Sequence, residues 1–369
     1  MLKRIYVDNF RCLVNFELAF DAIHLFLGPN GSGKTSVFDA LWKIQCFASG
    51  DCKVEDVFPS IDRTRWQSST LQQFELEFHG NGGIYKYHVD IDHDPEHQRN
   101  RVKRENLSFN GQPLLDVESG EVQLFRDSHS KGPKYTFDWS QSVLPTILSR
   151  PYNKHLTWFR ERLQRIIIVQ IIPALMSDES SKEEVRPSRR MENFVSWYRF
   201  LSRDQGKIVE LTRVLNEILD GFESFKFDPA GENNQVLSFF TKPVTGVGRL
   251  KYRFKEFSDG QRVLIALYAL ITCALSEDYT ICIDEPENFL ALPEIQPWLA
   301  KLYELCCETK IQALLISHHP ELINYLLASP VGYWFEHQTN APVRVERIGA
   351  SNESGLTASE LVARGWLHE

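Results

Sequence analysis

The chain contains the stretch Leu27-Gly28-Pro29-Asn30-Gly31-Ser32-Gly33-Lys34-Thr35-Ser36, which fits the pattern G-x-x-x-x-G-K-[ST] without a mismatch. Residues 23–27 before it are apolar and typical of a short buried strand, and residues 36–44 after it carry apolar side chains at helical spacing. Strand, glycine-rich loop and helix must follow in this order for such a pattern to be meaningful. The stretch therefore predicts a phosphate-binding loop within an α/β fold.

Each part of this loop has a chemical role toward phosphate. Gly31 and Gly33 allow successive backbone N–H groups to turn inward without a Cβ clash, and the helix start adds positive potential. We expect Lys34 to reach the β- and γ-phosphates of a nucleotide and the Thr35 hydroxyl to hold Mg²⁺. The expected nucleotide-binding residues of the loop are Asn30, Gly31, Ser32, Gly33, Lys34, Thr35 and Ser36.

The composition is that of a large globular chain. It has 369 residues, a formal net charge of −8 and 43% hydrophobic residues, which allows one large domain or two to three smaller ones. No apolar run approaches the ~20 residues that a membrane helix needs, and the N-terminus shows no signal-peptide pattern. The seven cysteines form no Cys-x-x-Cys pair, so neither a zinc site nor a disulfide framework is indicated. We expect a reduced, cytoplasmic protein without a membrane partner.

The spacing of apolar residues predicts three regions. Residues 1–150 carry the phosphate loop and alternating segments typical of antiparallel hairpins, including one at 74–91. Residues 151–256 change to helical spacing and then return to strands; their charged stretch 177–190 predicts a mobile loop. Residues 257–369 complete the chain.

The third region is expected to hold a strongly apolar helix at 258–276 and two short apolar strands at 280–283 and 312–316, which are typical of a covered parallel sheet. Two further strands and a helix near 357–364 are expected after them.

Asp284 and Glu285 follow the apolar strand at 280–283 and carry a second signal. A strand tip can hold Asp284 against the shell of a bound Mg²⁺ and place Glu285 beside the γ-phosphate, where it would polarise the attacking water. The alternative is an ordinary acidic turn after a strand. The phosphate loop upstream favours the catalytic interpretation.

Two weaker signals lie on the same part of the chain. Ser258, Gly260 and Gln261 stand at the start of the apolar helix, where a hydroxyl, backbone N–H groups and the helix dipole can bind an anion. Ordinary N-capping by Ser258 or Asp259 explains the same residues. His318 ends the strand at 312–316, where an imidazole could contact the γ-phosphate or the attacking water. An isolated histidine there is more often structural.

The order of these four signals resembles the ABC-type ATPase head. The resemblance implies a P-loop NTPase head of the α/β class, with a mixed central sheet flanked by an antiparallel β subdomain and a helical subdomain. It implies an ATPase that uses ATP and Mg²⁺. It also implies that Ser258 and Gly260 of one subunit bind the ATP held by another, within a homodimer or higher oligomer. Asp259 stands where many transporter signatures carry Gly, but an acidic residue also occurs in non-transporter branches.

Residues 7–11 and 284–290, and the wide gap from 36 to 257, resemble the RecF, SMC and overcoming-lysogenization-defect (OLD) branch. By this likeness Gln141 is the expected further Mg²⁺ ligand, with Gln72 and Gln73 as competitors. Arg11 is expected to approach the nucleotide, or else to be a surface arginine.

The resemblance predicts that nucleotide-driven dimerisation controls a separately encoded effector, a nuclease or toxin, in anti-phage defence. OLD nucleases carry a toprim nuclease domain after the histidine strand, and only about 50 residues follow His319 here, so none is expected. The alternatives are a RecF-like DNA-binding ATPase in repair and an ATP-gated scaffold with slow hydrolysis.

Direct DNA binding would require a basic surface, for which the sequence offers two clusters that are otherwise ordinary solvated charges. The clusters are Arg99, Arg101, Lys103 and Arg104, and Arg186, Arg189 and Arg190. A further group, Asp90, Asp92, His93, Asp94 and His97, looks like a set of metal ligands, but we interpret it as a solvated turn.

Overall fold

The computed structural model describes residues 1–50, 52–94, 96, 99–243, 248–275, 278–308, 311–318 and 331–348. The chain divides into two compact units. The first unit combines residues 1–166 with residues 326–369, and the second spans residues 167–325. The division into 1–150, 151–256 and 257–369 stays a prediction.

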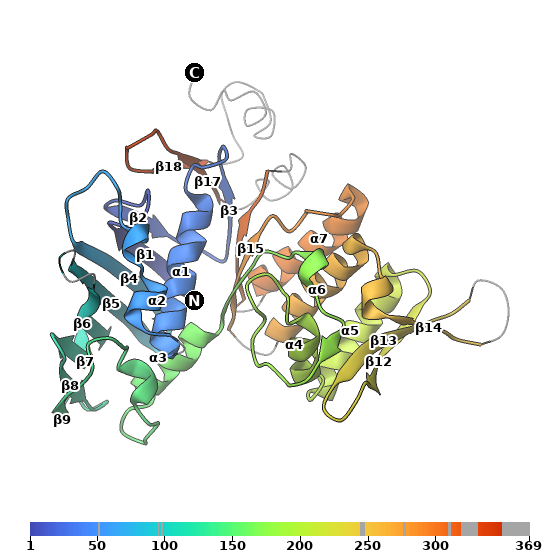
Figure 1. The fold of residues 1–369 in the computed structure, drawn as a ribbon, viewed down its shortest axis with the longest axis horizontal. Helices are drawn as coiled ribbons and strands as arrows, with labels where there is room; N and C mark the ends of the chain where they lie inside the picture. Colours follow the sequence, from blue (N-terminus) through green and yellow to red (C-terminus); the bar gives the residue numbers. More distant parts are fainter. Residues whose placement is uncertain are drawn as a thin grey trace. The chain divides into compact units, whose positions relative to one another are not determined.

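An antiparallel sheet of eight strands forms much of the first unit (Figure 1), in the order β2-β1-β4-β5-β6-β7-β8-β9. The strands are β1 (Leu2–Asp8), β2 (Phe16–Ala19), β4 (Leu71–Gly80), β5 (Gly83–Asp94), β6 (Arg99–Phe109), β7 (Gln112–Glu118), β8 (Glu121–Phe125) and β9 (Lys131–Thr136). Buried residues alternate along β4 as the sequence pattern predicts, and Asn81 and Gly82 take positive φ at the turn to β5. The expected hairpins are confirmed.

A second set of strands in this unit carries the phosphate loop. β3 (Ile23–Leu27) is fully buried and pairs in parallel with β17 (Val331–Glu336), which pairs antiparallel with β18 (Arg344–Ile348). In Figure 1 the red C-terminal strands lie beside blue β3. The loop leads into α1 (Lys34–Ser49). The remaining helical elements of the unit are α2 (Val54–Val57), α3 (Lys154–Gln164), η1 (Ser60–Asp62) and η2 (Leu144–Thr146).

The second unit is built around two parallel strands, β15 (Thr280–Asp284) and β16 (Gln312–Ile316), whose residues are all buried. Its helices are α4 (Phe194–Leu201), α5 (Gln205–Ile218), α6 (Asp259–Ala274), α7 (Leu292–Glu308) and the short η3 (Pro173–Leu175) and η4 (Phe254–Glu256). A smaller antiparallel sheet has the order β11-β13-β12 with β14 on β13. Its strands are β11 (Glu179–Ser180), β12 (Phe222–Pro229), β13 (Gln235–Thr241) and β14 (Leu250–Arg253).

Two details differ from the sequence prediction, and a third is not tested. The apolar run after α3 forms a strand, β10 (Ile166–Val169), because four consecutive β-branched residues are buried there. The stretch 177–190 contains β11, and its Asp178 receives the Arg253 guanidinium at 2.8 Å, so this stretch is packed onto the small sheet. The helix predicted near 357–364 lies outside the described residues.

The acidic group at 90–97 is not a solvated turn. Asp90 and His93 lie within β5 and are 4% and 2% exposed, because the strand continues further than the alternating pattern indicated. His97 lies outside the described residues. Over the part of the chain that the structure describes, no three His, Cys, Asp or Glu side chains are grouped as a metal site would require.

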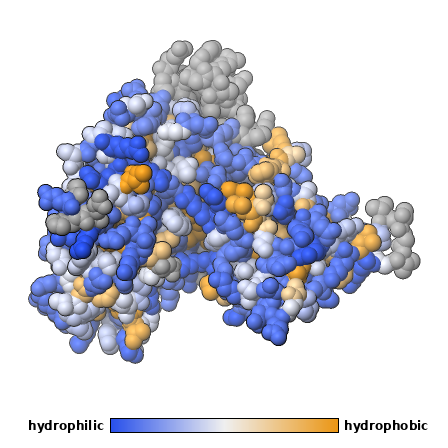
Figure 2. Space-filling model, in the orientation of Figure 1, coloured by the Kyte–Doolittle hydropathy of each residue, from blue (hydrophilic) through white to orange (hydrophobic). Residues whose placement is uncertain are grey.

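The surface drawn in Figure 2 is mostly hydrophilic, with small separate hydrophobic areas. Within the same described residues, no helix is both long and apolar enough to cross a membrane.

Candidate functional site

The phosphate loop has the backbone shape that its glycines predict. Gly28, Gly31 and Gly33 take φ values of +137°, +78° and +98°, which residues with a Cβ rarely adopt. A Cβ on Gly28 would lie 2.3 Å from the backbone oxygen of Phe335 on β17. A Cβ on Gly33 would lie 2.7 Å from Val343. The loop therefore packs against Phe335 of β17 and against Val343, both from the C-terminal part of the sequence.

Lys34 lies inside this loop and is 5% exposed. Its ammonium group donates to the carbonyl oxygens of Gly28 and Pro29, at 2.7 and 2.9 Å, and lies 3.3 Å from the Ser32 hydroxyl. The exposed Thr35 follows it at the start of α1. Ammonium, hydroxyl and helix-start N–H groups form the donor set that polyphosphate oxygens require, so the residues present fit a nucleotide.

Arg11 is anchored to the helix that the phosphate loop begins. Its guanidinium pairs with Asp39 on α1, and its Nε lies 2.9 Å from Asp62, which also pairs with Lys43 at 2.9 Å. Burial lowers the pKa of Arg11, but the carboxylates of Asp39 and Asp62 outweigh burial and raise it. The contact with Asp39, which sequence reasoning missed, ties Arg11 to the loop helix. Its approach to a nucleotide stays a prediction.

The three glutamines proposed for Mg²⁺ have different surroundings. Gln72 is fully buried; it donates to the Asn9 carbonyl at 2.8 Å and accepts from the His93 ring at 2.8 Å. Gln73 donates to Asp90 at 3.0 Å. Gln141 lies exposed in the turn that follows β9. Of the three, Gln141 has the most accessible side chain, and its role stays a prediction.

Asp284 ends β15, and Glu285, the next residue, faces the histidine that follows β16. Asp284 is 7% exposed at the strand end. Glu285 has a φ of +53°, and its N–H donates to the Ile316 carbonyl at 2.9 Å. The Glu285 carboxylate accepts from Asn288 at 2.7 Å, and its other oxygen lies 3.9 Å from His318 Nε2. The second unit therefore brings together Glu285 and His318, the two residues that the sequence predicts to be catalytic. Their catalytic role stays a prediction.

Glu287 links these strand tips, which sequence reasoning missed. One of its carboxylate oxygens accepts from the Ser317 hydroxyl at 2.5 Å and from the His318 N–H at 3.2 Å. The sequence shows Glu287 as the third acidic residue of Asp284-Glu285-Pro286-Glu287. The sequence does not show that this carboxylate reaches the neighbouring strand.

The start of α6 shows capping geometry. The Ser258 hydroxyl accepts from the Gln261 N–H at 3.2 Å, and the Gln261 side chain accepts from the Ser258 N–H at 3.0 Å, which is a capping box. A Cβ on Gly260 would lie 2.8 Å from the Phe289 carbonyl oxygen. The loop that follows Glu285 therefore lies across the start of α6. Phe289 is 56% exposed there.

Two family models match this chain, one within the first unit and one within the second. A family model described as "AAA ATPase domain" matches residues 1–78, and one described as "AAA domain, putative AbiEii toxin, Type IV TA system" matches residues 177–324. The chain is 22% identical over 357 residues to an OLD nuclease of Thermus scotoductus, covering 87% of this chain and 59% of the relative. The chain thus spans about three fifths of that relative's length.

One solved structure supports the fold. The chain aligns with the SmcHead bound to the C-winged helix domain of ScpA at a TM-score of 0.55 and 12% identity, over 94% of this chain and 98% of that one. The SMC head domain from Thermotoga maritima aligns with the same coverage, a TM-score of 0.48 and 15% identity. The two family models and the OLD nuclease relative agree with the resemblance to ABC-type ATPase heads of the RecF, SMC and OLD branch. The fold shared with the SmcHead confirms the predicted fold class.

Proposed function

We propose that this head binds ATP at the phosphate loop and hydrolyses it to ADP and phosphate. The observation that carries the proposal is the buried ammonium group of Lys34, held among the loop's own oxygens where phosphate oxygens would replace them. Thr35, Asp284 and Gln141 would hold Mg²⁺. When bound, this ion would neutralise charge that develops on the phosphates.

Glu285 is the proposed general base. Its carboxylate would orient the attacking water and take its proton. Asn288 holds one of its oxygens at 2.7 Å, and His318 lies 3.9 Å from the other. Glu287 would act as a positioning residue, because it fixes the backbone of His318 and the side chain of Ser317.

Ser258, Gly260 and Gln261 would serve the nucleotide of a second copy, so that two heads enclose two ATP molecules. Exposed Phe289 beside Gly260 supports an interface at this edge, since large apolar side chains are common at interface centres. Arg11 would act from the side of its own phosphate loop.

The nucleotide-dependent dimer would control an effector protein, a nuclease or toxin, in cytoplasmic anti-phage defence. The relative is a nuclease and one matching family model describes a putative toxin of a toxin–antitoxin system, which supports this choice of effector. A RecF-like DNA-binding ATPase of repair and an ATP-gated scaffold with slow hydrolysis are the other candidates.

The proposal can be tested with Glu285→Gln, which is expected to retain ATP. This variant is purified from its native host with ATP and Mg²⁺, and its companions are identified by mass spectrometry and nucleic-acid staining. A nuclease or toxin that co-purifies, and is absent with Lys34→Ala, supports effector control. Bound DNA without a protein partner would replace effector control by the repair function.

A further inference from the structure

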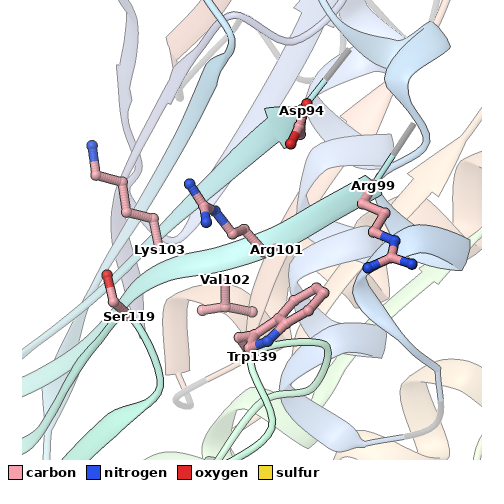
Figure 3. A pocket seen from close by; sticks show the side chains of 7 residues that line it. All are labelled: Asp94, Arg99, Arg101, Val102, Lys103, Ser119 and Trp139. Carbon is pink, nitrogen blue, oxygen red and sulfur yellow. The ribbon is translucent and has the colours of Figure 1, made fainter. Parts of the chain in front are cut away.

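A cavity of about 410 Å³ opens on the antiparallel sheet of the first unit, among residues that the proposed ATPase mechanism does not use. Three cationic side chains of β6 line it: Arg99, Arg101 and Lys103. Trp139 contributes an indole ring beside Val102, as Figure 3 shows. Asp94 and Ser119 complete the lining.

A β-bulge lies at the end of this row of cations. Opposite β5, Ile91 pairs with Val102 and Asp90 pairs with Arg104, so Lys103 is an extra residue between them. Bulges re-aim side chains, often at functional sites. Arg99, Arg101 and Lys103 are exposed at alternate positions of the strand, and Arg104, beside the bulge, is exposed as well.

Carboxylates neutralise this positive charge only in part. The Arg101 guanidinium donates to the Asp92 carboxylate through Nη2 at 2.7 Å and through Nε at 3.0 Å, which orients Arg101. Asp94 lines the same cavity. Among the described residues, neither Arg99 nor Lys103 has an ion-pair partner. On a chain with a net charge of −8, this is a local site of positive potential.

Backbone hydrogen bonds fix the walls of the cavity. The Val102 N–H donates to the Trp139 carbonyl at 2.8 Å, and the Ser119 N–H donates to the Lys103 carbonyl at 2.9 Å. The segment after Trp139 is held by buried Glu105, which accepts from the Val143 N–H at 2.9 Å. The Trp139 ring is 39% exposed on this fixed backbone, so it can offer a face to a ligand.

We propose that this cavity binds single-stranded nucleic acid, with backbone phosphates on Arg99, Arg101 and Lys103 and a base against Trp139. Cations that follow the phosphates, together with an aromatic ring on which a base stacks, are the usual elements of single-strand binding. Residues 99 and 103 are roughly 13 Å apart along the strand. This span suits successive phosphates of a polymer better than one free nucleotide. In a duplex, the base faces are already stacked and cannot reach the indole.

The test is fluorescence anisotropy on the full chain without ATP, with a labelled 20-nucleotide thymidine strand as the probe. Unlabelled duplex of equal length and free thymidine monophosphate serve as competitors. Binding is expected to be tightest for the single strand and to weaken as salt rises. Absence of single-strand binding, or equal competition by duplex or by the mononucleotide, would overturn the proposal.

Variants identify the site. Trp139→Ala is expected to weaken single-strand binding about 5- to 150-fold, and Trp139→Phe to restore most of it, because stacking requires an aromatic face. Arg99→Gln with Lys103→Gln should reduce the slope of log K against log salt by about 1.4, at about 0.7 for each phosphate contact.

The matched control is Lys131→Gln with Lys134→Gln, which removes the same charge from exposed positions of β9 in the same sheet. If this pair weakens binding as much as the β6 pair, the effect is general charge and the proposed site is wrong. Binding that persists in Lys34→Ala separates this site from the proposed ATPase function, which depends on Lys34.

Discussion

The phosphate loop and the strand tips after β15 and β16 are specified in different ways. The loop is one continuous run of ten residues, and its three glycines and helix start define its shape. The strand tips are joined by Glu287 and Ser317, which are 30 residues apart in the sequence. A sequence motif reveals the local geometry of the loop, whereas the geometry of the strand tips arises from strand pairing. In the proposed function, the first region binds the nucleotide and the second carries out the chemical step.

The largest expected effects, on ATP binding and on turnover, test whether the two regions have these separate roles. Lys34→Ala should abolish ATP binding, because the loop loses its only ammonium group. Glu285→Gln should keep ATP affinity within about twofold and reduce turnover by about 10²- to 10⁴-fold, the usual contribution of a general base. Isothermal titration calorimetry and phosphate release measure the two quantities. Unchanged turnover in Glu285→Gln would remove the catalytic assignment.

Much of the fold could be predicted from the sequence because its signals are local. Residues 27–36 carry the turn-forming glycines, and the alternation along 74–78 gives one face of β4. Capping residues at Ser258 and Gln261 locate the start of α6. These features need only neighbours within a few positions.

The remaining features depend on long-range contacts. Pairing of β15 with β16 brings Glu287 to His318, and α1 brings Asp39 to Arg11; neither contact leaves a pattern in the sequence. β17 pairs with β3 and places the Phe335 carbonyl against Gly28, and this contact is likewise visible only in the structure. Sequence reasoning therefore named the residues proposed to react and missed the contacts of Glu287 and Asp39 that hold them in place.

The next prediction, smaller in effect, tests whether Glu287 positions Ser317 and His318. Glu287→Ala removes the acceptor of both Ser317 and His318, so turnover should fall about tenfold while ATP affinity stays unchanged. Glu287→Gln keeps a carbonyl acceptor and should lose less. Glu304→Gln, which removes an exposed carboxylate of α7 paired with Lys301, is the control. A fall in ATP affinity equal to the fall in turnover would contradict positioning.

Two glycine variants test how the loop is held. Gly28→Ala should destabilise the fold by about 2–4 kcal/mol, since its Cβ would meet the Phe335 oxygen at a strained φ. Gly31→Ala places its Cβ in open space and should cost only about 1–2 kcal/mol, from its positive φ. Denaturant unfolding measures both. Equal losses would show that β17 does not constrain the loop.

The smallest effect concerns pH. Burial lowers the pKa of His93 to about 4, well below its ordinary value of 6.5. A lowered histidine pKa stabilises the fold above pH 6.5, and this contribution is lost as pH falls toward 4. The unfolding midpoint should therefore decrease over that range, and His93→Gln should make the decrease shallower. An identical pH profile in the variant would show that His93 does not control it.

The central claim is that Ser258, Gly260 and Gln261 of one copy act on the ATP held by another copy. Mixing two inactive variants tests this claim most directly. Ser258→Asp keeps an N-cap for α6 but places negative charge beside the phosphates. Lys34→Ala and Ser258→Asp should each be inactive alone. Their equal mixture should recover roughly a quarter of wild-type ATPase activity, since half of the dimers are mixed and each has one intact site. Activity that stays at the sum of the two variants would contradict the claim.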